Sequence, residues 1–387
     1  MHKIILLFDI SEQYGQSLLL GIVKYFKENS SALFCRMPLY YRETLGINGI
    51  VKFAREWGAQ GIVAQLDNTK QVKKIADSGI HLILEDFRER FDDFPNITGG
   101  YFEAGQMGAE YFVKKGFKNF AFYGFKNIVW SRERSEGYES YLHNLGFDVY
   151  HFEHEELHTT NLWYYKPSAL SKWLQSLPKP IAIMACDDAR GQHITEACKH
   201  ADIRIPDDVI VLGVDNDEMT CNLSDPPLSS VNLDTEKGGY EAARLMDLMI
   251  QGKIKKPQNV MVMPTYIVTR QSTDIAAASD EHISLALNYI HKNLENEIHV
   301  SDVLGQVPIS RRSLEKRFLE VTGTSVYKYI FKLRMQRFSQ RLLETDKRIS
   351  EIALDAGFTL TNNISRQFKQ IHGCTPGEYR KKHLPRK

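Results

Sequence analysis

The stretch IPDDVIVLGVDNDEM, residues 205–219, contains an apolar run, 209–214, that ends at Asp215 and Asn216. A continuous run of Val, Ile and Leu is typical of a strand buried on both faces of a parallel sheet. Similar runs recur upstream, and several precede a stretch with helical spacing: KIILLF before GQSLLLGIVKYFKE, GIVAQL before TKQVKKIADSG, and AIMAC before ARGQHITEACKHA. The sequence therefore predicts an open α/β architecture in which helices connect parallel strands.

Polar side chains follow these apolar runs, at the strand ends where open α/β sheets bind their ligands. They are Asp9, Asp67, Glu85, Asp86, Asp187, Asp188, Asp215 and Asn216. No G-x-G-x-x-G or G-x-x-x-x-G-K-[ST] motif is present, and repeated carboxylates would repel a nucleotide. Carboxylates and amides accept hydrogen bonds from hydroxyl groups, and Trp130 or Tyr14 can cover an apolar ring face, so we predict a neutral polyol as ligand. A helix cap is the alternative for each Asp, and a metal site also stays open.

Charge is distributed unevenly along the 387 residues, a length that suggests two or three domains. Residues 281–387 carry 19 Lys and Arg against 11 Asp and Glu, whereas residues 1–280 carry 30 against 37. A basic segment joined to an acidic body is expected when one part approaches a polyanion. The small, polar stretch STDIAAASDE, residues 272–281, separates the two parts and predicts a linker between domains 1–271 and 282–387.

Cysteine usage and hydropathy exclude several classes of protein. The five cysteines are widely spaced and form no C-x-x-C, so neither a disulfide framework nor a zinc site is indicated, and we expect no cofactor. No apolar run approaches the roughly 20 residues of a membrane span, and the N-terminal apolar run is too short for a signal peptide. We expect a cytoplasmic protein without a membrane partner.

Four segments of the acidic part resemble the effector domain of the LacI type, a type I periplasmic-binding fold that holds sugars between two lobes. They are AIMACDDARGQ (182–192), IPDDVIVLGVDNDEM (205–219), DPPLSSV (225–231) and GGYEAARLMDLMI (238–250). The resemblance covers roughly residues 3–270 and implies a two-lobed α/β domain that binds a small sugar. The family carries its DNA-binding headpiece before this domain, but here the first strand is expected from residue 3, so a DNA reader has to lie elsewhere.

The same resemblance implies ligand residues. An Arg on the helix after the FYG strand grips sugar hydroxyls in that family, and WSRERSEGY places Arg134 there with Trp130 and Arg132 beside it. Asp215 falls on the family's strand-end Asp, while Cys186 and Asp187 fall on its Asn-Asp pair, so a Cys replaces the Asn. The predicted sugar site contains Asp9, Tyr14, Asp67, Trp130, Arg132, Arg134, Asp187, Asp188, Asp215 and Asn216.

A repeat organises the basic part. Leu314, Phe318, Val321 and Gly323 recur 50 residues later as Ile364, Phe368, Ile371 and Gly373. Each copy reads as a short helix, a tight turn and an amphipathic helix, which predicts an all-α domain with two helix-turn-helix motifs at about 300–321 and 349–372. A connecting helix is predicted over residues 325–345, about 31 Å long, close to one turn of B-DNA.

The repeat also predicts which residues face outward. They are Arg311, Arg312, Glu315 and Lys316 in the first copy, and Thr361, Asn362, Asn363, Ser365 and Arg366 in the second. These types suit the edges of bases in the major groove, with a solvated charged surface as the alternative. The basic residues of the connecting helix are predicted to contact phosphates: Lys328, Lys332, Arg334, Arg337 and Arg341.

The stretches ISEIALDAGF (349–358) and SRQFKQIHGCTPGEYRKK (365–382) resemble the DNA-binding domain of the AraC/XylS family, over residues 282–383. The two resemblances together imply a sugar-responsive regulator that binds double-stranded promoter DNA, forms a homodimer through its sugar-binding domains and recruits RNA polymerase. We expect an activator of genes for the use of a pentose of the xylose type. A regulator responding to another sugar, such as arabinose, is the first alternative, and an enzyme acting on a sugar is the second.

The histidines of HFEHEELH, residues 151–158, form one more cluster. His151, His154 and His158 are spaced by 3 and 4 residues, which would place them on one face of a helix as metal ligands. No Cys partner and no further motif accompany them, so we expect a polar surface and no metal.

Overall fold

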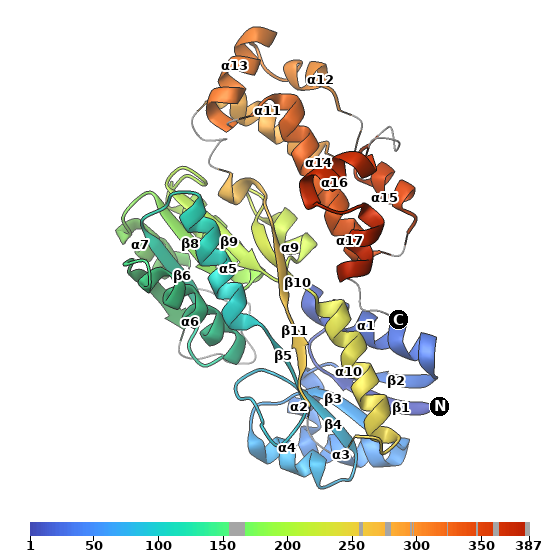
Figure 1. Ribbon diagram of the computed structural model, residues 1–387. Coiled ribbons are helices and arrows are strands. Elements are labelled where there is room, and N and C mark those ends of the chain that lie inside the picture. The colour runs from blue at the N-terminus through green and yellow to red at the C-terminus, as the bar shows by residue number, and fades with distance from the viewer. Residues whose placement is uncertain are drawn as a thin grey trace. The chain divides into compact units, whose positions relative to one another are not determined.

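The protein is described by a computed structural model of two compact units, Met1–Thr273 and Asp274–Lys387 (Figure 1). The structure describes residues 1–154, 167–254, 258–274, 280–294, 296, 298–322, 324–345, 347–358 and 364–383. Within these ranges, no helix combines the length and the apolar character needed to cross a membrane.

The first unit contains two six-stranded sheets. The first sheet has the order β11-β5-β4-β3-β1-β2 and is parallel throughout. Its strands are β1 His2–Leu7, β2 Ala32–Arg36, β3 Gly61–Gln65, β4 His81–Glu85, β5 Asn96–Gly99 and β11 Val260–Val262. The second sheet has the order β12-β10-β9-β8-β6-β7, and only β12 runs antiparallel to its neighbour. Its strands are β6 Phe120–Phe125, β7 Val149–His154, β8 Ile181–Ala185, β9 Val209–Val214, β10 Ser229–Leu233 and β12 Pro264–Val268. Every residue of β9 is buried, as the apolar run predicts.

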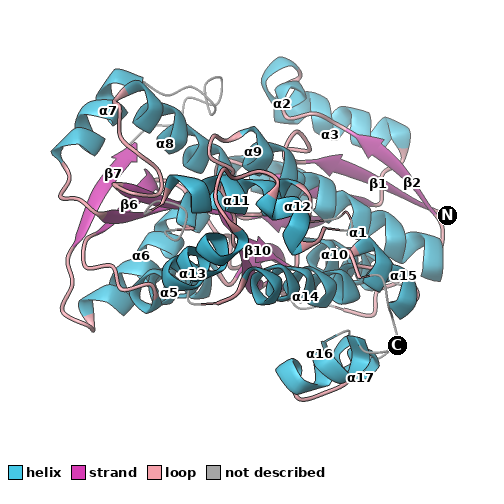
Figure 2. Ribbon diagram, turned by 90° about the horizontal axis from the view of Figure 1, so that it is seen from above, coloured by secondary structure: helices cyan, strands magenta, loops and turns pink. Residues whose placement is uncertain are grey.

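Helices cover both faces of each sheet, so each sheet is the centre of a lobe (Figure 2). In the first lobe, one face packs against α1 Gln13–Asn29 and α10 Thr235–Ile250, and the other against α3 Gly46–Trp57 and α4 Thr69–Ala76, with the short α2 Tyr40–Thr44 before α3. In the second lobe, α5 Tyr101–Lys114 and α6 Val129–His143 cover one face, and α7 Pro167–Ser176, α8 Asp188–His200 and α9 Glu218–Leu223 lie on the other.

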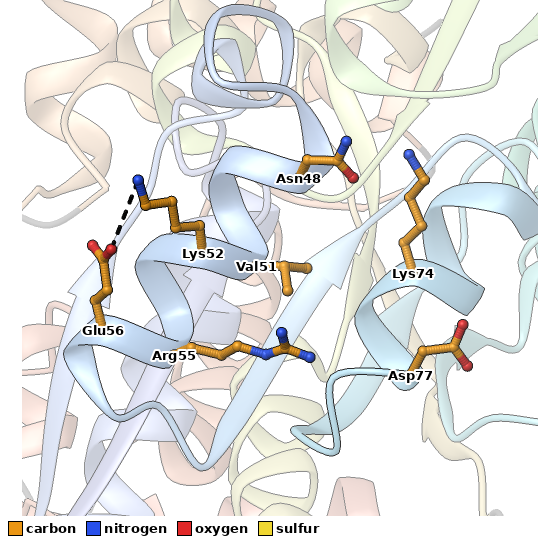
Figure 3. Close-up of a pocket in the computed structure, with 7 residues that line it drawn as sticks. All are labelled: Asn48, Val51, Lys52, Arg55, Glu56, Lys74 and Asp77. Carbon is orange, nitrogen blue, oxygen red and sulfur yellow. Dashed lines mark ion pairs between the residues drawn. The ribbon is translucent and has the colours of Figure 1, made fainter.

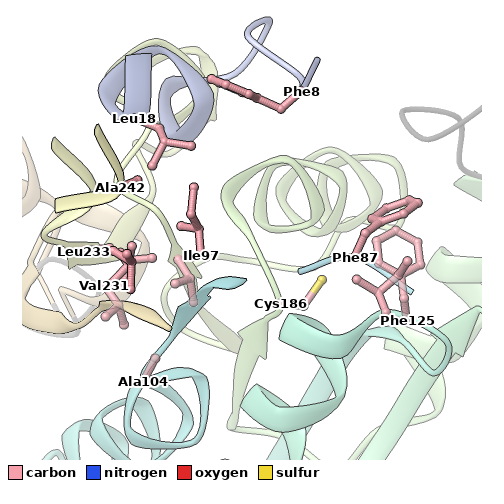
Figure 4. Close-up of a cluster of buried hydrophobic side chains, with 14 of the residues drawn as sticks. Phe8, Leu18, Phe87, Ile97, Ala104, Phe125, Cys186, Val231, Leu233 and Ala242 are labelled. Atoms are coloured by element: carbon pink, nitrogen blue, oxygen red, sulfur yellow. The ribbon is translucent and has the colours of Figure 1, made fainter. Parts of the chain in front are cut away.

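The chain passes between the lobes three times, at β5–α5, β10–α10 and β11–β12. A continuous buried cluster joins the two lobes: Phe8, Leu18 and Ile97 come from the first and Phe125, Cys186 and Val231 from the second (Figure 4). Apolar burial on this scale is the main stabilising contribution of the unit. The predicted two-lobed α/β domain is confirmed.

The second unit is all-helical and has two separate cores. Its helices are α11 Glu281–Lys292, α12 Val300–Leu304, α13 Arg311–Thr322, α14 Val326–Glu344, α15 Ile349–Asp355, α16 Ile364–His372 and α17 Pro376–His383. The N-terminal half of α14 contributes Val326 and Ile330 to one core, and its C-terminal half contributes Phe338 and Leu342 to the other. At 19 residues, α14 is about 28 Å long and links two helix-turn-helix pairs, α12–α13 and α15–α16.

The repeated apolar positions predict which side of α13 and of α16 is buried, and this prediction is wrong for one residue, Ile371. Leu314 and Phe318 are fully buried, as are Ile364 and Phe368 in the second copy. Ile371, however, is 55% exposed. His372 takes the inward place instead: its ring stacks on Phe368 at 4.2 Å, and its Nε2 lies 2.9 Å from Ser339 Oγ on α14.

The predicted linker 272–281 begins inside the first unit. Ser272 and Thr273 are buried and belong to a 3₁₀ turn, Gln271–Thr273. Residues 275–279 of that stretch lie outside the described residues, so the predicted domain limits stay predictions.

Candidate functional site

A narrow cleft between the two lobes is the candidate effector site. Its lining consists of Glu12, Gln13, Tyr14, Asp187, Asp188, Ala189, Asp215, Asp217 and Thr220. The enclosed space is about 20 Å³, roughly the room that one water molecule needs. The backbone N–H of Gln13 donates to Asp217 Oδ2 across the cleft at 3.2 Å. The lobes are therefore closed on each other, and a ligand as large as a sugar has to part them.

Arg134 on α6 is the central cation of this cleft. Only 2% of the residue is exposed; its Nη2 donates to Asp215 Oδ1 at 2.9 Å and its Nη1 donates to the Cys186 carbonyl. The guanidinium also lies over the rings of Tyr101 and Trp130, 5.5 and 5.3 Å from their centroids. Burial alone would lower the pKa of Arg134, but Asp215 and the other neighbours outweigh it and raise the pKa, so the charge persists.

Asp187 is the N-cap of α8, and its carboxylate already accepts hydrogen bonds from the protein. Its Oδ1 accepts from the backbone N–H and from Nε of Arg190, each at 2.7 Å. The Arg190 guanidinium stands 4.9 Å from the centre of the Phe125 ring. Cys186 accepts a hydrogen bond from Arg134 through its backbone carbonyl, so this contact does not depend on the side chain at position 186.

The first lobe contributes carboxyl groups that burial has made weak acids. Burial, followed by the charges of Asp9, Asp86 and Glu12, raises the pKa of Glu85 to about 8. Glu12 is partly open to solvent, but the surrounding protein displaces enough water to raise its pKa to about 7. The negative charge of Asp187 is the next cause of this rise. Near neutral pH, Glu85 is mainly protonated, and it is a hydrogen-bond donor as well as an acceptor.

Several buried polar atoms around the cleft have no hydrogen-bond partner within the part of the chain that the structure describes. They are Tyr14 Oη, Glu85 Oε2, Asp86 Oδ1, Arg134 Nε and Asp188 Oδ1. Leaving such groups unpaired costs about 1–3 kcal/mol each. Donors, acceptors and the aromatic faces of Tyr14, Tyr101 and Trp130 together match a ligand rich in hydroxyl groups, whereas the carboxyl groups would repel a phosphate.

Six of the predicted ligands lie together near the cleft: Asp9, Tyr14, Trp130, Arg134, Asp187 and Asp215. One of them, Asp9, already accepts hydrogen bonds through Oδ1 from Ser11 N and Oγ, at 2.8 and 2.7 Å. Asp188 lies in the floor, where its Oδ2 accepts from Asp217 N at 2.6 Å.

Asp67, Arg132 and Asn216 have protein partners and do not line the cleft, and their role as ligands stays a prediction. Asp67 pairs with Arg42 at 3.2 Å, and Arg132 is half-exposed beside Glu136 on the same helix. The Asn216 side chain accepts from Arg270 and donates to Asn232 at 2.9 and 3.2 Å.

Sequence reasoning missed Glu12, Tyr101 and Arg190 as members of the site. The strand-end rule marks Glu85, but Glu12 lies beyond the strand end, at the N-cap of α1, and Tyr101 begins α5 after a lobe crossing. A charge pair at positions 187 and 190 was the available signal for Arg190, because residues three apart share a helix face.

A wider hollow on the outside of the first lobe is a poor alternative (Figure 3). It is lined by Lys52 and Arg55 on α3, by Lys74 on α4 and by Asp77, which follows α4, and all four side chains are exposed. Its lining contains none of the unpaired buried atoms that mark the cleft.

The histidine cluster gives no support to a metal site. His151 forms an ion pair with Glu139, whereas the side chain of His154 and all of His158 lie outside the described residues. Among the residues that are described, no group of three His, Cys, Asp or Glu could hold a metal ion.

The second unit presents its candidate DNA-reading residues outward. Arg311, Arg312 and Lys316 on α13 are exposed and Glu315 is half-buried, while Leu314 and Phe318 lie beneath them. Ser365 and Arg366 occupy the matching exposed face of α16. Thr361, Asn362 and Asn363 lie outside the described residues.

The cations of α14 do not all face outward. Lys328 and Lys332 are exposed, but Arg334 Nη2 donates to the Asn296 carbonyl at 2.7 Å. Arg334 is therefore engaged with the segment before α12, and its role as a phosphate contact stays a prediction.

Comparison with known proteins gives matches for both units. Residues 109–273 match the family described as a periplasmic binding protein-like domain, and residues 305–382 match a helix-turn-helix domain. The xylose operon regulatory protein of Escherichia coli (strain K12) is 27% identical over 386 residues, covering 98% of this chain and 97% of that protein. Its counterpart from Haemophilus influenzae is 28% identical over 392 residues, covering 98% of each.

Solved structures agree with this similarity. A structure described as the xylose-binding transcription activator xylR is similar with a TM-score of 0.60 and 26% identity, covering 99% of both chains. A complex of the transcriptional regulator CelR with cellobiose has a TM-score of 0.59 at 18% identity, covering 70% of this chain and 84% of that one, which shows the fold alone. The predicted fold class is confirmed, and the chain is homologous to xylose operon regulators over its full length.

Proposed function

We propose, from the premise that this chain is an AraC-type transcription regulator with a periplasmic-binding-protein-like sugar domain, that a pentose controls its binding to promoter DNA. The alternative of an enzyme acting on a sugar is set aside, because both domain matches and the full-length relatives are those of a transcription regulator. Xylose is the first candidate effector, with arabinose as the second.

The observation that carries the proposal is the buried ion pair of Arg134 and Asp215, set between aromatic rings and unpaired polar atoms. An ion pair with so little exposure is costly unless further hydrogen bonds satisfy it. A sugar hydroxyl that bonds to Arg134 Nε or to Asp215 supplies such bonds. The match to a periplasmic binding protein-like domain supports the same ligand class.

The mechanism is a shift between two conformations. Parting of the lobes admits the sugar, and closure brings Glu12, Tyr14 and Glu85 against it. The sugar changes DNA binding only by as much as its affinities for the two conformations differ. The exposed cations of α13 and α16 support contact with bases in two successive major grooves.

Assembly completes the proposal. Two chains associate through their sugar domains, because paired half-sites raise the effective concentration of the second reader. The dimer acts in the cytoplasm as an activator that recruits RNA polymerase. Because the two helix-turn-helix pairs of one chain differ in sequence, we expect direct repeats in the operator.

A melting screen with free sugars tests the effector. D-xylose, L-arabinose, other pentoses and hexoses are added to the full chain, and the melting temperature is followed. Ligand at 100 times its Kd stabilises by about 2.7 kcal/mol, so the effector should give a clear upward shift, while its phosphate ester should not. If no free sugar shifts the melting temperature, the proposed ligand class is wrong.

DNA binding is tested by the salt dependence of its affinity. The logarithm of the binding constant should fall linearly with the logarithm of salt concentration, since bound cations displace counterions from phosphates. Operator fragments with direct and with inverted half-sites are compared at one salt concentration. A preference for the inverted arrangement would contradict the expected asymmetric reading.

A further inference from the structure

The turn after β9 connects the cleft to the end of the first unit. Asp215 and Asn216 both have positive φ, 99° and 52°, which is uncommon for residues other than Gly. Their side chains contact different parts of the domain. Asp215 accepts a hydrogen bond from Arg134 in the cleft, while Asn216 Oδ1 accepts one from Arg270 Nη2 at 2.9 Å. Asp215 and Asn216 are neighbours in one short turn, so a displacement of the Asp215 backbone also moves the backbone of Asn216.

Arg270 begins the segment by which the chain leaves the sugar domain. Its Nη1 donates to the Leu228 carbonyl at 2.9 Å and its backbone N–H donates to Ser229 Oγ at 2.7 Å. Two residues later, Ser272 Oγ donates to the Val211 carbonyl at 2.7 Å, and Val211 belongs to β9, the strand that directly precedes Asp215. The exit segment is thus attached to β9 and to the start of β10 by hydrogen bonds to buried partners.

The first residue beyond the exit segment is fixed to the DNA-binding unit. Thr273 Oγ1, the last anchor of the first unit, lies 2.7 Å from Ser229 Oγ. Asp274, the next residue, accepts a hydrogen bond from Tyr329 Oη on α14 at 2.6 Å. Helix α14 carries both helix-turn-helix pairs, so a shift of the exit segment reaches the element that spaces the two readers.

The ligand has a direct way to start this shift. Arg134 and Asp215 are 2.9 Å apart, and no sugar hydroxyl fits between partners at hydrogen-bond distance. A hydroxyl that replaces the direct hydrogen bond between Arg134 Nη2 and Asp215 Oδ1 lengthens this contact, which moves the Asp215 carboxylate and the turn that bears it.

We propose that Asn216 and Arg270 form a relay between the cleft and the DNA-binding unit. Binding of a ligand in the cleft moves Asp215, and Asn216 and Arg270 pass this movement to the exit segment 270–273 and so to the DNA-binding unit. The inference rests on the proposed function of the cleft as a sugar site. Asn216 is then a positioning residue that couples the two ends of the relay, in place of the ligand role that the sequence suggests.

The test measures coupling instead of binding alone. DNA affinity of the full chain is determined with and without D-xylose, or with the pentose that gives the largest melting shift, and the ratio of the two affinities is the coupling factor. Allosteric factors are typically about 5–150-fold. Asn216→Gly tolerates the positive φ but removes the acceptor, so we expect the factor to fall below about 2-fold while the sugar-induced melting shift remains.

Three further variants separate an effect on coupling from an effect on folding. Arg270→Gln should reduce the factor in the same way, whereas Arg204→Gln, at a site 71% exposed in the second lobe, is the matched control and should keep it. Asn216→Asp retains an acceptor for Arg270 and should restore most of the coupling. By reciprocity, operator DNA should change the sugar affinity of the native chain, and of Asn216→Asp, by the same factor.

The possible outcomes test the relay and the sugar-controlled regulation separately. Asn216→Gly and Arg270→Gln with an unchanged coupling factor would overturn the relay alone, with the sugar-controlled regulator intact. A native chain whose DNA affinity no sugar alters would overturn the proposed function, and the relay with it.

Discussion

The cleft of the first unit and the outer faces of the second unit hold their polar side chains in opposite states. In the cleft, Arg134 is 2% exposed and bonded to Asp215. On α13, Arg311 and Arg312 are exposed, and no ion pair involves them among the residues that the structure describes. The sugar therefore has to exchange existing bonds inside the protein, whereas DNA only has to exchange the water and counterions around a free side chain.

This difference separates stability from function in the two units. Removing one member of a buried pair leaves an uncompensated charge, so a cleft substitution affects folding and ligand binding together. Removing an exposed cation leaves nothing buried behind, so its effect should be confined to DNA. Substitutions in the cleft should therefore have larger effects on stability than substitutions of exposed cations on α13 and α16.

The largest effect is expected from Arg134→Ala. The variant leaves Asp215 buried without its cation, and the free energy of unfolding of the first unit should fall by about 3–5 kcal/mol. Urea denaturation of the full chain measures this loss, and the sugar-induced melting shift should vanish. Arg132→Ala removes a half-exposed Arg from the same helix and should cost less than about 1 kcal/mol. Equal losses for the two variants would contradict the buried role of Arg134.

A smaller, pH-dependent effect is expected from Glu85→Gln. The pKa of Glu85 is raised from 4.5 to about 8, so the folded state holds a proton that the unfolded state releases above 4.5. Stability should therefore decrease as pH rises between about 4.5 and 8, and the neutral Gln should remove this part of the decrease, about 2–4 kcal/mol. Urea midpoints at pH 5, 6.5 and 8 measure it.

Exposed Glu56→Gln on α3 is the matched control for this pH dependence. Its stability curve should run parallel to that of the native chain. If the curve of Glu85→Gln also runs parallel, Glu85 is ionised in the folded protein and is not a proton-bearing ligand group.

On the outer face, Arg312→Ala should change DNA recognition and leave folding intact. A base-reading Arg contributes about 1–3 kcal/mol of discrimination. Titrations on the operator and on random duplex measure the loss, and Arg244→Ala, an exposed Arg of the first unit paired with Glu241, serves as the control. An equal loss on both duplexes would mean that Arg312 contacts phosphate instead of a base.

The sequence predicted the outer faces more fully than the cleft, and the contrast explains why. A helix with period 3.6 places Leu314 and Phe318 inside and Arg311, Arg312 and Lys316 outside from local spacing alone. The alternation of buried runs and helices likewise predicted an α/β architecture with parallel strands, whereas the division into two lobes was implied by the family resemblance. Strand-end residues could be assigned to an edge of the sheet, but their partners come from distant segments: Asn216 turns to Arg270 and Asp67 to Arg42. Such pairings depend on tertiary packing, which no local period encodes.

The smallest effect is expected where the repeat misassigned a residue. Ile371 is 55% exposed, so Ile371→Ala should change the free energy of unfolding by less than about 0.5 kcal/mol. Phe368→Ala, three residues earlier and fully buried, should cost about 3–5 kcal/mol. His372→Ala should fall between them, because it removes the stack on Phe368 and the hydrogen bond with Ser339. Urea denaturation measures this order. A greater loss of unfolding free energy for Ile371→Ala than for His372→Ala would mean that Ile371, and not His372, lies on the buried face of α16.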